Sequence, residues 1–385
     1  MFQEQLQVSD EVRISRTGRF VIAALLMPHR VLSTSTRNGG QQDQIRYLVN
    51  HQSCEPSNHQ ERHDYMVGMG LAAYHDVVCA ELGLDPTAVA LMGTAANMNN
   101  VAVVRKSYQK LAVTAVVTAG VESNATCAGD PAAWCETDQG WKKLPAYAGT
   151  INTMLLVNHS LTDGALARAV ITMTEAKSAA LNRLAVRSRQ SQDPATGTGT
   201  DQYCVAAPLD DHKPLTSAST HVVLGELIGS AVREATCEAL RWQNGLEPSR
   251  TRSLFYALRP YGIDEESVWK EIAPLLSDRN LELLKANKNA VFCDPLIASS
   301  AYALASVFDR FRYGTLPANA TGAALCAQTA TLAVQISGQP RLWPCFHAEL
   351  AAAEPTHPVD LVAKAIGLGW SAKWQGEEKR EASSL

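Results

Sequence analysis

No stretch of this sequence stays apolar for the about 18 residues that a membrane-spanning helix needs. The first twelve residues, MFQEQLQVSDEV, are polar and acidic, and they lack the basic-then-apolar order of a signal peptide. The sequence therefore predicts a protein that has no membrane partner and stays in the cytoplasm.

Positive charge is also scarce. The 34 Lys and Arg residues are outnumbered by 38 Asp and Glu residues, which gives a net charge of -4 and removes the electrostatic footprint that nucleic acid requires. Charged residues make up 19% of the chain and apolar residues 46%, a balance that excludes a disordered protein. We expect a globular chain without a nucleic-acid partner, and its 385 residues suffice for roughly two domains.

Several familiar chemical signatures are missing. The nine cysteines form an odd set without a C-x-x-C pair, which favours free, mostly buried thiols over a disulfide framework or a zinc ribbon. The chain has no G-x-S-x-G, no H-E-x-x-H and no P-loop. Any catalytic site must therefore be assembled from other residues.

What the sequence does contain is four loops rich in Gly, Ser, Thr and Asn, each beside an apolar β-branched run. Glycine permits close backbone approach, and the hydroxyl and amide side chains supply donors and acceptors, so such loops suit a ligand rich in carbonyls and amides. We expect strand ends to bring them together at one polar site. They are LSTSTRNGG (32–40), VVTAGVESNA (116–125), AGTINTMLLVN (148–158) and PATGTGTD (194–201).

Strand-like and helix-like runs alternate up to about residue 247. Residues 20–27, 30–34 and 168–174 have strand patterns, whereas residues 174–184 and 221–242 have helical ones. These patterns predict an α/β fold with a central mixed sheet flanked by helices over residues 1–247. Residues 248–373 predict a helical C-terminal region packed on that domain, followed by a charged, frayed tail at 374–385.

The polar residues at the loop tips are the candidates for a site. A carboxylate beside a cluster of backbone N–H groups could act as a general base next to an oxyanion hole, the minimum equipment for hydrolysing an amide. Glu175 and Asp201 are the candidate carboxylates. Each can equally be a structural cap, because acids favour helix starts and turns.

A second group consists of histidines spaced by four. His59 and His63 can share a helical face and could hold a divalent ion with a third ligand such as His51 or Glu55, although Pro56 interrupts the run. Sets assembled from such loose spacing are often accidental. The prediction is therefore no resident metal, with His51, His59 and His63 as the residues to test.

Seven motifs in order resemble one known family. STSTRNGG, NHQSCEP, TAANMNN with VVTAGVESNA, GTINTMLLVN, TEAKSAAL, ATGTGTD and HVVLGELIGSAVREA together resemble the adenosylcobinamide amidohydrolases of corrinoid salvage, over residues 19–240. The resemblance implies hydrolysis of the amide that joins the aminopropanol arm to the corrin ring, which releases adenosylcobyric acid. It also implies a corrinoid substrate and no organic cofactor.

With that reaction in view, we assign hypothetical roles to the loop residues. Glu175 or Asp201 would activate water, Lys177 would stabilise charge, the Gly39 and Gly40 amides would form the oxyanion hole, and His51 is a rival base. The residues expected to contact the substrate are Asn38, Gly39, Gly40, Glu122, Asn124, Thr150, Asn152, Thr196 and Thr198.

Three alternatives stay open. Thr150 follows Gly149 and could be a self-processing nucleophile freed at a new N-terminus. The chain could bind corrinoids without catalysis, or it could be a regulatory protein whose C-terminal helices between residues 295 and 336 dock a partner through an exposed apolar patch. The sequence leaves open whether the substrate is cobinamide, its phosphate or a complete cobamide, and whether the protein is a homo-oligomer.

Overall fold

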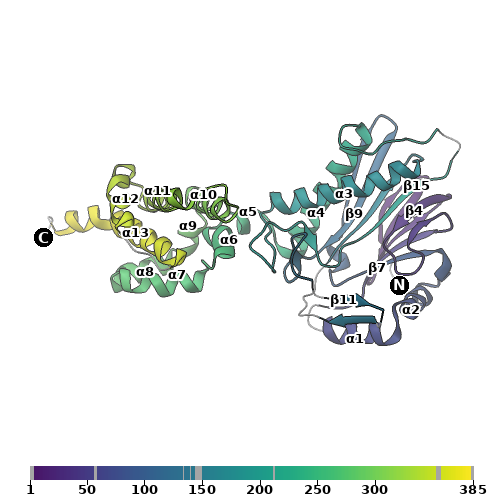
Figure 1. Ribbon diagram of the computed structural model, residues 1–385, viewed down its shortest axis with the longest axis horizontal. Helices are drawn as coiled ribbons and strands as arrows, with labels where there is room; N and C mark the ends of the chain where they lie inside the picture. Colours follow the sequence, from purple (N-terminus) through teal and green to yellow (C-terminus); the bar gives the residue numbers. More distant parts are fainter. Residues whose placement is uncertain are drawn as a thin grey trace. The chain divides into compact units, whose positions relative to one another are not determined.

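The computed structural model describes residues 4–55, 59–132, 134–138, 140–143, 150–210, 213–352 and 357–382. The chain divides into two compact units, Met1–Leu246 and Glu247–Leu385 (Figure 1). The first unit contains the sheets, and the second is helical.

The first unit contains two large sheets. One has five strands in the order β1-β2-β3-β6-β7, in which only β6 and β7 are parallel. Its strands are β1 (Glu4–Val8), β2 (Val12–Thr17), β3 (Phe20–Leu25), β6 (Tyr47–Gln52) and β7 (Val89–Thr94).

The other sheet has six strands in the order β5-β4-β15-β13-β9-β8, in which only β13 and β15 are parallel. The central strand β13 is buried at every position, as expected of a strand that is covered on both faces. The strands are β4 (His29–Ser33), β5 (Gly40–Gln42), β8 (Ala102–Tyr108), β9 (Leu111–Ala119), β13 (Ile151–Val157) and β15 (Gln202–Pro208).

The two sheets pack face to face between layers of helices (Figure 1). One apolar core joins Ile14 and Met92 of the five-stranded sheet to Val116 and Met154 of the six-stranded sheet. Helix α2 (Leu71–Leu82) covers the outer face of the first sheet, where Val78 packs on the sheet residues of a second cluster. Helices α3 (Asp163–Arg183) and α4 (Val223–Asn244) form the layer outside the second sheet, where α4 packs on β8 and β9 and α3 packs on α4. The unit is thus a four-layer sandwich in the order helix, sheet, sheet, helix.

Two shorter pairs of strands complete the first unit. Strand β10 (Ala125–Thr126) pairs with β14 (Gly197–Thr198), and β11 (Trp134–Thr137) pairs with β12 (Gly140–Lys143). Helix α1 (His59–Met69) precedes α2, and Gly70, with φ of 87°, separates the two helices.

The strand predicted at residues 168–174 is wrong. These residues lie inside α3, which begins at its N-cap Thr162 and continues to Arg183 without a break. The buried residues of this helix, among them Leu166, Ala169, Met173 and Ala176, recur every three or four positions, so a helical face overrides the local β propensity of Val170 and Ile171.

The second unit is built from helices around its own core. Leu304 of α10, Ala333 of α11 and Trp370 of α13 are buried in that core, and a Cβ atom at Gly369 would lie 2.5 Å from the Ala333 carbonyl oxygen. The helices are α5 (Pro248–Thr251), α6 (Leu254–Leu258), α7 (Glu265–Ile272), α8 (Asp278–Ala286), α9 (Lys288–Phe292), α10 (Pro295–Arg312), α11 (Ala318–Ser337), α12 (Trp343–Ala351) and α13 (Pro358–Ala382). The fold class predicted from the sequence, an α/β sheet domain with a helical C-terminal region, is confirmed. Residues 374–382, which the sequence assigned to a frayed tail, belong to helix α13.

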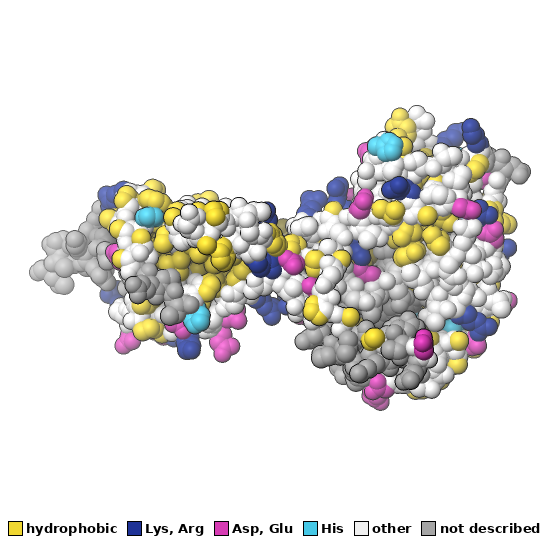
Figure 2. All heavy atoms as spheres, in the orientation of Figure 1, with side chains coloured by type: hydrophobic (Ala, Val, Ile, Leu, Met, Phe, Trp, Pro, Cys, Tyr) yellow, Lys and Arg dark blue, Asp and Glu magenta, His cyan; other side chains and the backbone are white. Residues whose placement is uncertain are grey.

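Large apolar side chains are exposed at separate places on this unit. Between residues 295 and 336 these are Leu296 at the start of α10, and Phe311 and Tyr313 at its end. The rise of about 1.5 Å per residue puts the two ends of α10 more than about 20 Å apart. Figure 2 shows hydrophobic side chains, a class that includes alanine, across the visible face of the unit. Within the described part of the chain, no helix is long and apolar enough to cross a membrane.

Candidate functional site

Each of the four predicted loops begins or ends at the same end of the strands of the six-stranded sheet, which we call the strand edge. Strands β4 and β9 end there, and β13 and β15 begin there, because Ile151 pairs with Ala119, Asn152 with Gln202, and Ser33 with Cys204. Two of the loops therefore lead into strands rather than out of them. Antiparallel neighbours place a strand start beside a strand end, so both kinds of loop reach the same edge.

Asp201 lies at the centre of this edge and is surrounded by donors. The Lys177 ammonium pairs with its Oδ2, and the Thr198 hydroxyl donates to its Oδ1. The backbone N–H groups of Ile151 (3.0 Å) and Thr198 (3.1 and 3.2 Å) donate to the same carboxylate. The side chains of Lys177 and Asp201 are only 15% and 18% exposed. The carboxylate thus fixes one ammonium and two backbone segments in place.

Gly197 makes room for this ion pair. A Cβ atom at this position would lie 2.7 Å from Lys177 Nζ and would overlap Asp201 Oδ2. Strand β14, which contains Gly197, pairs with β10 and holds Thr198 opposite Ala125. The Gly-Thr run, which the sequence places in a loop, is therefore constrained and tightly packed.

Thr150 lies beside Asp201, at the residue before β13. Its hydroxyl donates to the Thr200 carbonyl oxygen (2.7 Å) and contacts Asn152 Oδ1 (3.3 Å), while the next backbone N–H, that of Ile151, donates to Asp201. Thr150 is 6% exposed and Asn152 is fully buried. The hydroxyl is held at the polar edge of a central strand.

A buried polar network ties this edge to the facing sheet. Asn152 Nδ2 donates to Asn50 Oδ1 (2.8 Å) and to the Gly93 carbonyl oxygen (3.0 Å), and Asn50 Nδ2 donates to Thr118 Oγ1 (2.7 Å). The Gly93 N–H donates to the side chain of Gln202 (3.1 Å). Because buried polar groups of this kind are costly unless paired, the network fixes the two sheets in register at the site.

Asn124 and Thr196 also lie at this edge. Asn124 is 5% exposed, and its side-chain amide would lie 3.2 to 3.3 Å from a Cβ atom built at Gly199. The Thr196 hydroxyl accepts from the Ala128 N–H (2.9 Å), and the Thr196 carbonyl accepts from Ser178 on α3 (2.8 Å). Together with Thr150, Asn152, Lys177, Thr198 and Asp201, these residues form what we call the strand-edge cluster.

The other candidates of the first loop serve the scaffold. Asn38, with φ of 60°, donates to the carbonyl oxygens of Pro86 (2.7 Å) and Val89 (2.9 Å), at the start of β7 and away from Gly93 near its end. A Cβ atom at Gly39 would overlap the Ser35 carbonyl oxygen, and Gly40 pairs with Ser33 in the β4–β5 hairpin. The structure does not bring these residues to Asp201, since the loop runs along β7 and returns into its own hairpin.

Glu175 and Glu122 are exposed. Glu175 precedes Lys177 by two positions on α3, a rotation of about 200° around the helix axis. Among the described residues, Glu175 has no hydrogen-bond or ion-pair partner. The expectation that it stands where a strand ends and a helix begins is wrong, because α3 already starts at Asp163.

His51 lies on the other side of the five-stranded sheet. Its neighbour Asn50 belongs to the inter-sheet network, whereas the His51 ring stacks on Phe20 (4.6 Å between centroids) and faces Tyr74 of α2. Burial, reinforced by the positive charges of Arg19 and Arg62, lowers the pKa of His51 from 6.5 to about 3. The imidazole is 1% exposed, so it packs as a neutral core side chain.

This burial makes His51 a source of acid sensitivity. The unfolded chain protonates His51 near pH 6.5 and the folded protein only near pH 3, so the unfolded state binds more protons in between and stability falls as the pH drops. His51→Phe keeps the stacking on Phe20 but has no group that titrates. Between pH 7 and pH 5, we expect the free energy of unfolding of the wild type to fall by about 2 kcal/mol more than that of His51→Phe. Urea unfolding of both proteins at the two pH values measures this difference, and equal pH dependence would contradict the buried neutral imidazole.

No group of three His, Cys, Asp or Glu side chains in the described parts of the chain is arranged to hold a metal ion. The metal set considered from the sequence falls partly outside them, because the side chains of His59 and His63 are not among the described ones. Gly149, which precedes Thr150, likewise lies outside the described residues.

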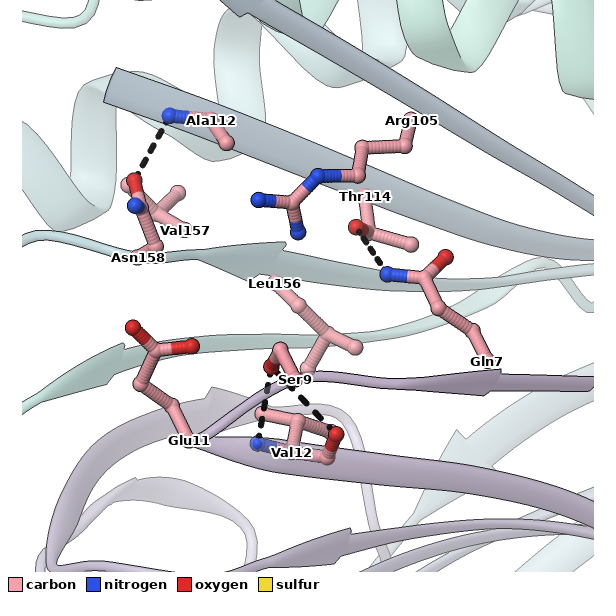
Figure 3. A pocket seen from close by; sticks show the side chains of 10 residues that line it. All are labelled: Gln7, Ser9, Glu11, Val12, Arg105, Ala112, Thr114, Leu156, Val157 and Asn158. Carbon is pink, nitrogen blue, oxygen red and sulfur yellow. Dashed lines mark hydrogen bonds between the residues drawn. The ribbon is translucent and has the colours of Figure 1, made fainter. Parts of the chain in front are cut away.

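A separate pocket opens at the opposite end of the sandwich. The pocket is lined by residues from the start of β9 and the end of β13. Figure 3 shows the Arg105 guanidinium pointing into the pocket, with Glu11 on its other side. Gln7 donates to Thr114 Oγ1 there (3.1 Å), which joins the two sheets at this end. The seven residues of β13 separate this pocket from the strand-edge cluster by about 20 Å. None of the candidate residues predicted from the sequence lines it.

Sequence reasoning missed Asn50, Thr118 and Gly197. Asn50 is buried within β6, in which every residue except Tyr47 is buried, and a buried polar side chain needs a partner. That signal was available in the sequence, but the partner Asn152 lies 102 positions away. The partner of Asn50 becomes known only from the way in which the two sheets pack on each other.

The comparisons with known proteins agree with the motif order. The family model described as adenosylcobinamide amidohydrolase matches residues 5–248. An uncharacterized protein of Methanocaldococcus jannaschii is 35% identical over 222 residues, which are 55% of this chain and 83% of that protein. The family match covers both sheets and all members of the strand-edge cluster, and it ends where the helical unit begins.

Proposed function

The chain belongs to the adenosylcobinamide amidohydrolase family, and we propose that it hydrolyses the amide joining the aminopropanol arm to the corrin ring of adenosylcobinamide. The products are adenosylcobyric acid, which can re-enter cobalamin assembly, and the free amino alcohol. Water supplies the hydroxyl of the new acid, and its proton goes to the released amine.

The observation that carries this proposal is the strand-edge cluster. It gathers an ammonium, a carboxylate, hydroxyls and side-chain amides at one partly buried place. A corrin ring carries a rim of acetamide and propionamide groups, which need donors and acceptors of this kind. Asn124, Thr196 and Thr198 are the side chains we assign to that rim.

Lys177 is assigned to the developing charge. When a nucleophile adds to an amide carbonyl, the oxygen becomes negative, and a fixed ammonium in a site of low exposure stabilises it. Asp201 holds the Lys177 ammonium in place, and its oxygens already accept four other contacts from Thr198 and Ile151. We therefore assign Asp201 to positioning and not to water activation. Glu175 and His51 have no role in this proposal, since one is exposed and the other is buried behind the five-stranded sheet.

Incubation of the purified protein with adenosylcobinamide tests the proposal directly. Adenosylcobyric acid and aminopropanol, both detected by mass, are the expected products. Parallel reactions with the phosphate of adenosylcobinamide and with a complete cobamide identify the preferred substrate from the ratio of kcat/KM values. A change in the visible corrinoid spectrum without any released amine would instead make the chain a corrinoid-binding protein.

Removal of divalent metal should leave this reaction unchanged. We expect the same kcat/KM before and after dialysis against EDTA, because the strand-edge cluster supplies one carboxylate and one ammonium and no set of three ligands. Loss of product that returns on addition of Zn²⁺ would contradict this expectation. In that case His51, His59 and His63 would be the metal ligands to test by substitution.

A further inference from the structure

The four polar loops contain two acidic residues, Glu122 and Asp201. The Asp201 carboxylate already accepts from the Lys177 ammonium, from a hydroxyl and from two backbone N–H groups, so it is not available to take a proton from water. Glu122, in contrast, is exposed, and among the described residues its carboxylate has no hydrogen-bond or ion-pair partner. Glu122 is therefore the loop carboxylate that can still act as a base.

Glu122 stands in a short turn that is anchored at both ends to the strand-edge cluster. Before the turn, the Gly120 N–H donates to the Thr150 carbonyl oxygen (3.0 Å). After the turn, Ala125 of β10 pairs with Thr198 of β14. One residue spans at most about 3.6 Å, so the Glu122 backbone stays within about 7 Å of Gly120 and about 11 Å of Ala125. The turn thus connects the neighbours of two members of the cluster and keeps Glu122 close to both.

The residues beside Glu122 fix the backbone of this turn. Val121 is buried, and its N–H donates to Asn244 Oδ1 at the end of α4 (3.1 Å). Asn124 is buried too, and its amide packs closely against Gly199. The Glu122 side chain is therefore presented to solvent from a backbone that is held on both sides.

Two other acids do not share this position. Asp130, the next acid along the chain, accepts from the Cys127 N–H (2.6 Å) and from the Ser188 hydroxyl (2.5 Å), so its oxygens are already used. Glu175 is exposed, but it is rotated by about 200° around α3 from Lys177.

Lys177 and Asp201 alone do not complete the chemistry of amide hydrolysis. Water is a weak nucleophile until a base takes its proton, and an amine leaves readily only if its nitrogen gains a proton as the C–N bond breaks. One carboxylate can meet both needs, because the proton that it takes from water can be given to the nitrogen. Proton transfer by a positioned side chain contributes about 10² to 10⁴ to the rate.

We propose that Glu122 is the general base and then the general acid of the reaction, an inference that rests on the proposed function. The oxygen of water bonds to the amide carbonyl carbon while the Glu122 carboxylate takes one of the water protons. The carbonyl oxygen becomes negative and is stabilised by Lys177. When the C–N bond breaks, Glu122 gives its proton to the nitrogen. The amino alcohol leaves as a neutral amine, the corrin acid keeps the other water proton, and the carboxylate is restored.

Glu122→Gln tests this role, because glutamine keeps the size of the side chain but cannot take a proton from water. We expect kcat for release of aminopropanol from adenosylcobinamide to fall by at least about a hundredfold, while KM changes little. Glu175→Gln is the matched control, since it removes the same charge from another exposed carboxylate without a partner among the described residues. This control should keep the kcat and KM of the wild type. Urea unfolding of both variants should match that of the wild type, because both side chains are exposed.

A smaller fall in kcat for Glu122→Gln would overturn the role. A loss confined to KM would overturn it as well, because Glu122 would then bind the substrate and not transfer a proton. An equal loss in Glu175→Gln would show a general effect of charge and have the same consequence. A wild type that releases no amine would refute the proposed function and the role of Glu122 with it, whereas an active wild type beside an equally active Glu122→Gln would refute the role alone.

Discussion

Lys177→Met is expected to lower kcat/KM for adenosylcobinamide by about 10² to 10³, the range seen when one preorganised stabiliser of a developing oxyanion is removed. Methionine keeps much of the length of the side chain but has no charge. The Asp201 carboxylate would retain the Thr198 and Ile151 donors and lose its ion pair with Lys177. A fall in kcat at nearly unchanged KM, measured by release of aminopropanol, would show that the ammonium stabilises the transition state and not the bound substrate.

Lys106→Met is the matched control. Lys106 pairs with Glu234 (2.6 Å), but these side chains are 33% and 55% exposed, so the pair contributes little to stability. We expect wild-type kinetics and unfolding for this variant. If the two variants lost the same activity, the effect of Lys177→Met would reflect general charge removal and not its place at the strand edge.

The sequence predicted that the four loops reach the same end of a sheet, because their composition is visible in single segments. Glycine and threonine stand beside each apolar run, asparagine stands beside three of them, and the runs become β4, β9, β13 and β15. The strand order was not predictable, since it depends on pairings such as Ile151 with Ala119 and Ser33 with Cys204. Those pairings decide that two loops enter the sheet while two leave it.

The same composition led to the prediction that the first loop joins the site, which the structure does not support. The first loop contains Asn38, Gly39 and Gly40, which look like a ligand-binding turn, but Asn38 caps backbone carbonyls at β7 and the glycines close a hairpin. Hydroxyl and amide side chains satisfy backbone groups as readily as they bind a ligand. Local sequence does not distinguish these uses, because the deciding partners are contributed by another strand.

For Glu175 the error had a different source. Its local β-branched run, with Val170 and Ile171, suggested a strand that would present the carboxylate at its end. The N-cap at Thr162 and the buried positions of α3 show that helical periodicity over 21 residues outweighs a short β-branched run. The helix turns Lys177 toward Asp201 and leaves Glu175 exposed.

Gly197→Ala is expected to cause a comparable loss, about 10² in kcat/KM, although it removes no functional group. The added Cβ would lie 2.7 Å from Lys177 Nζ and would overlap Asp201 Oδ2, so the ion pair must move. Displacements of about 1 Å in a positioned site cost activity on this scale. The same displacement should loosen the hydrogen bond by which Asp201 anchors the Ile151 N–H at the start of β13.

Gly229→Ala is the matched control for Gly197→Ala. Gly229 lies inside α4, where an added Cβ would meet no atom within 4 Å, so alanine should stabilise the helix by up to about 1 kcal/mol and leave activity unchanged. Kinetics and urea unfolding of both variants separate the two effects. Gly197→Ala displaces the Lys177–Asp201 pair but keeps both of its charges. Wild-type turnover by this variant would therefore mean that the geometry of the pair is not required for the reaction.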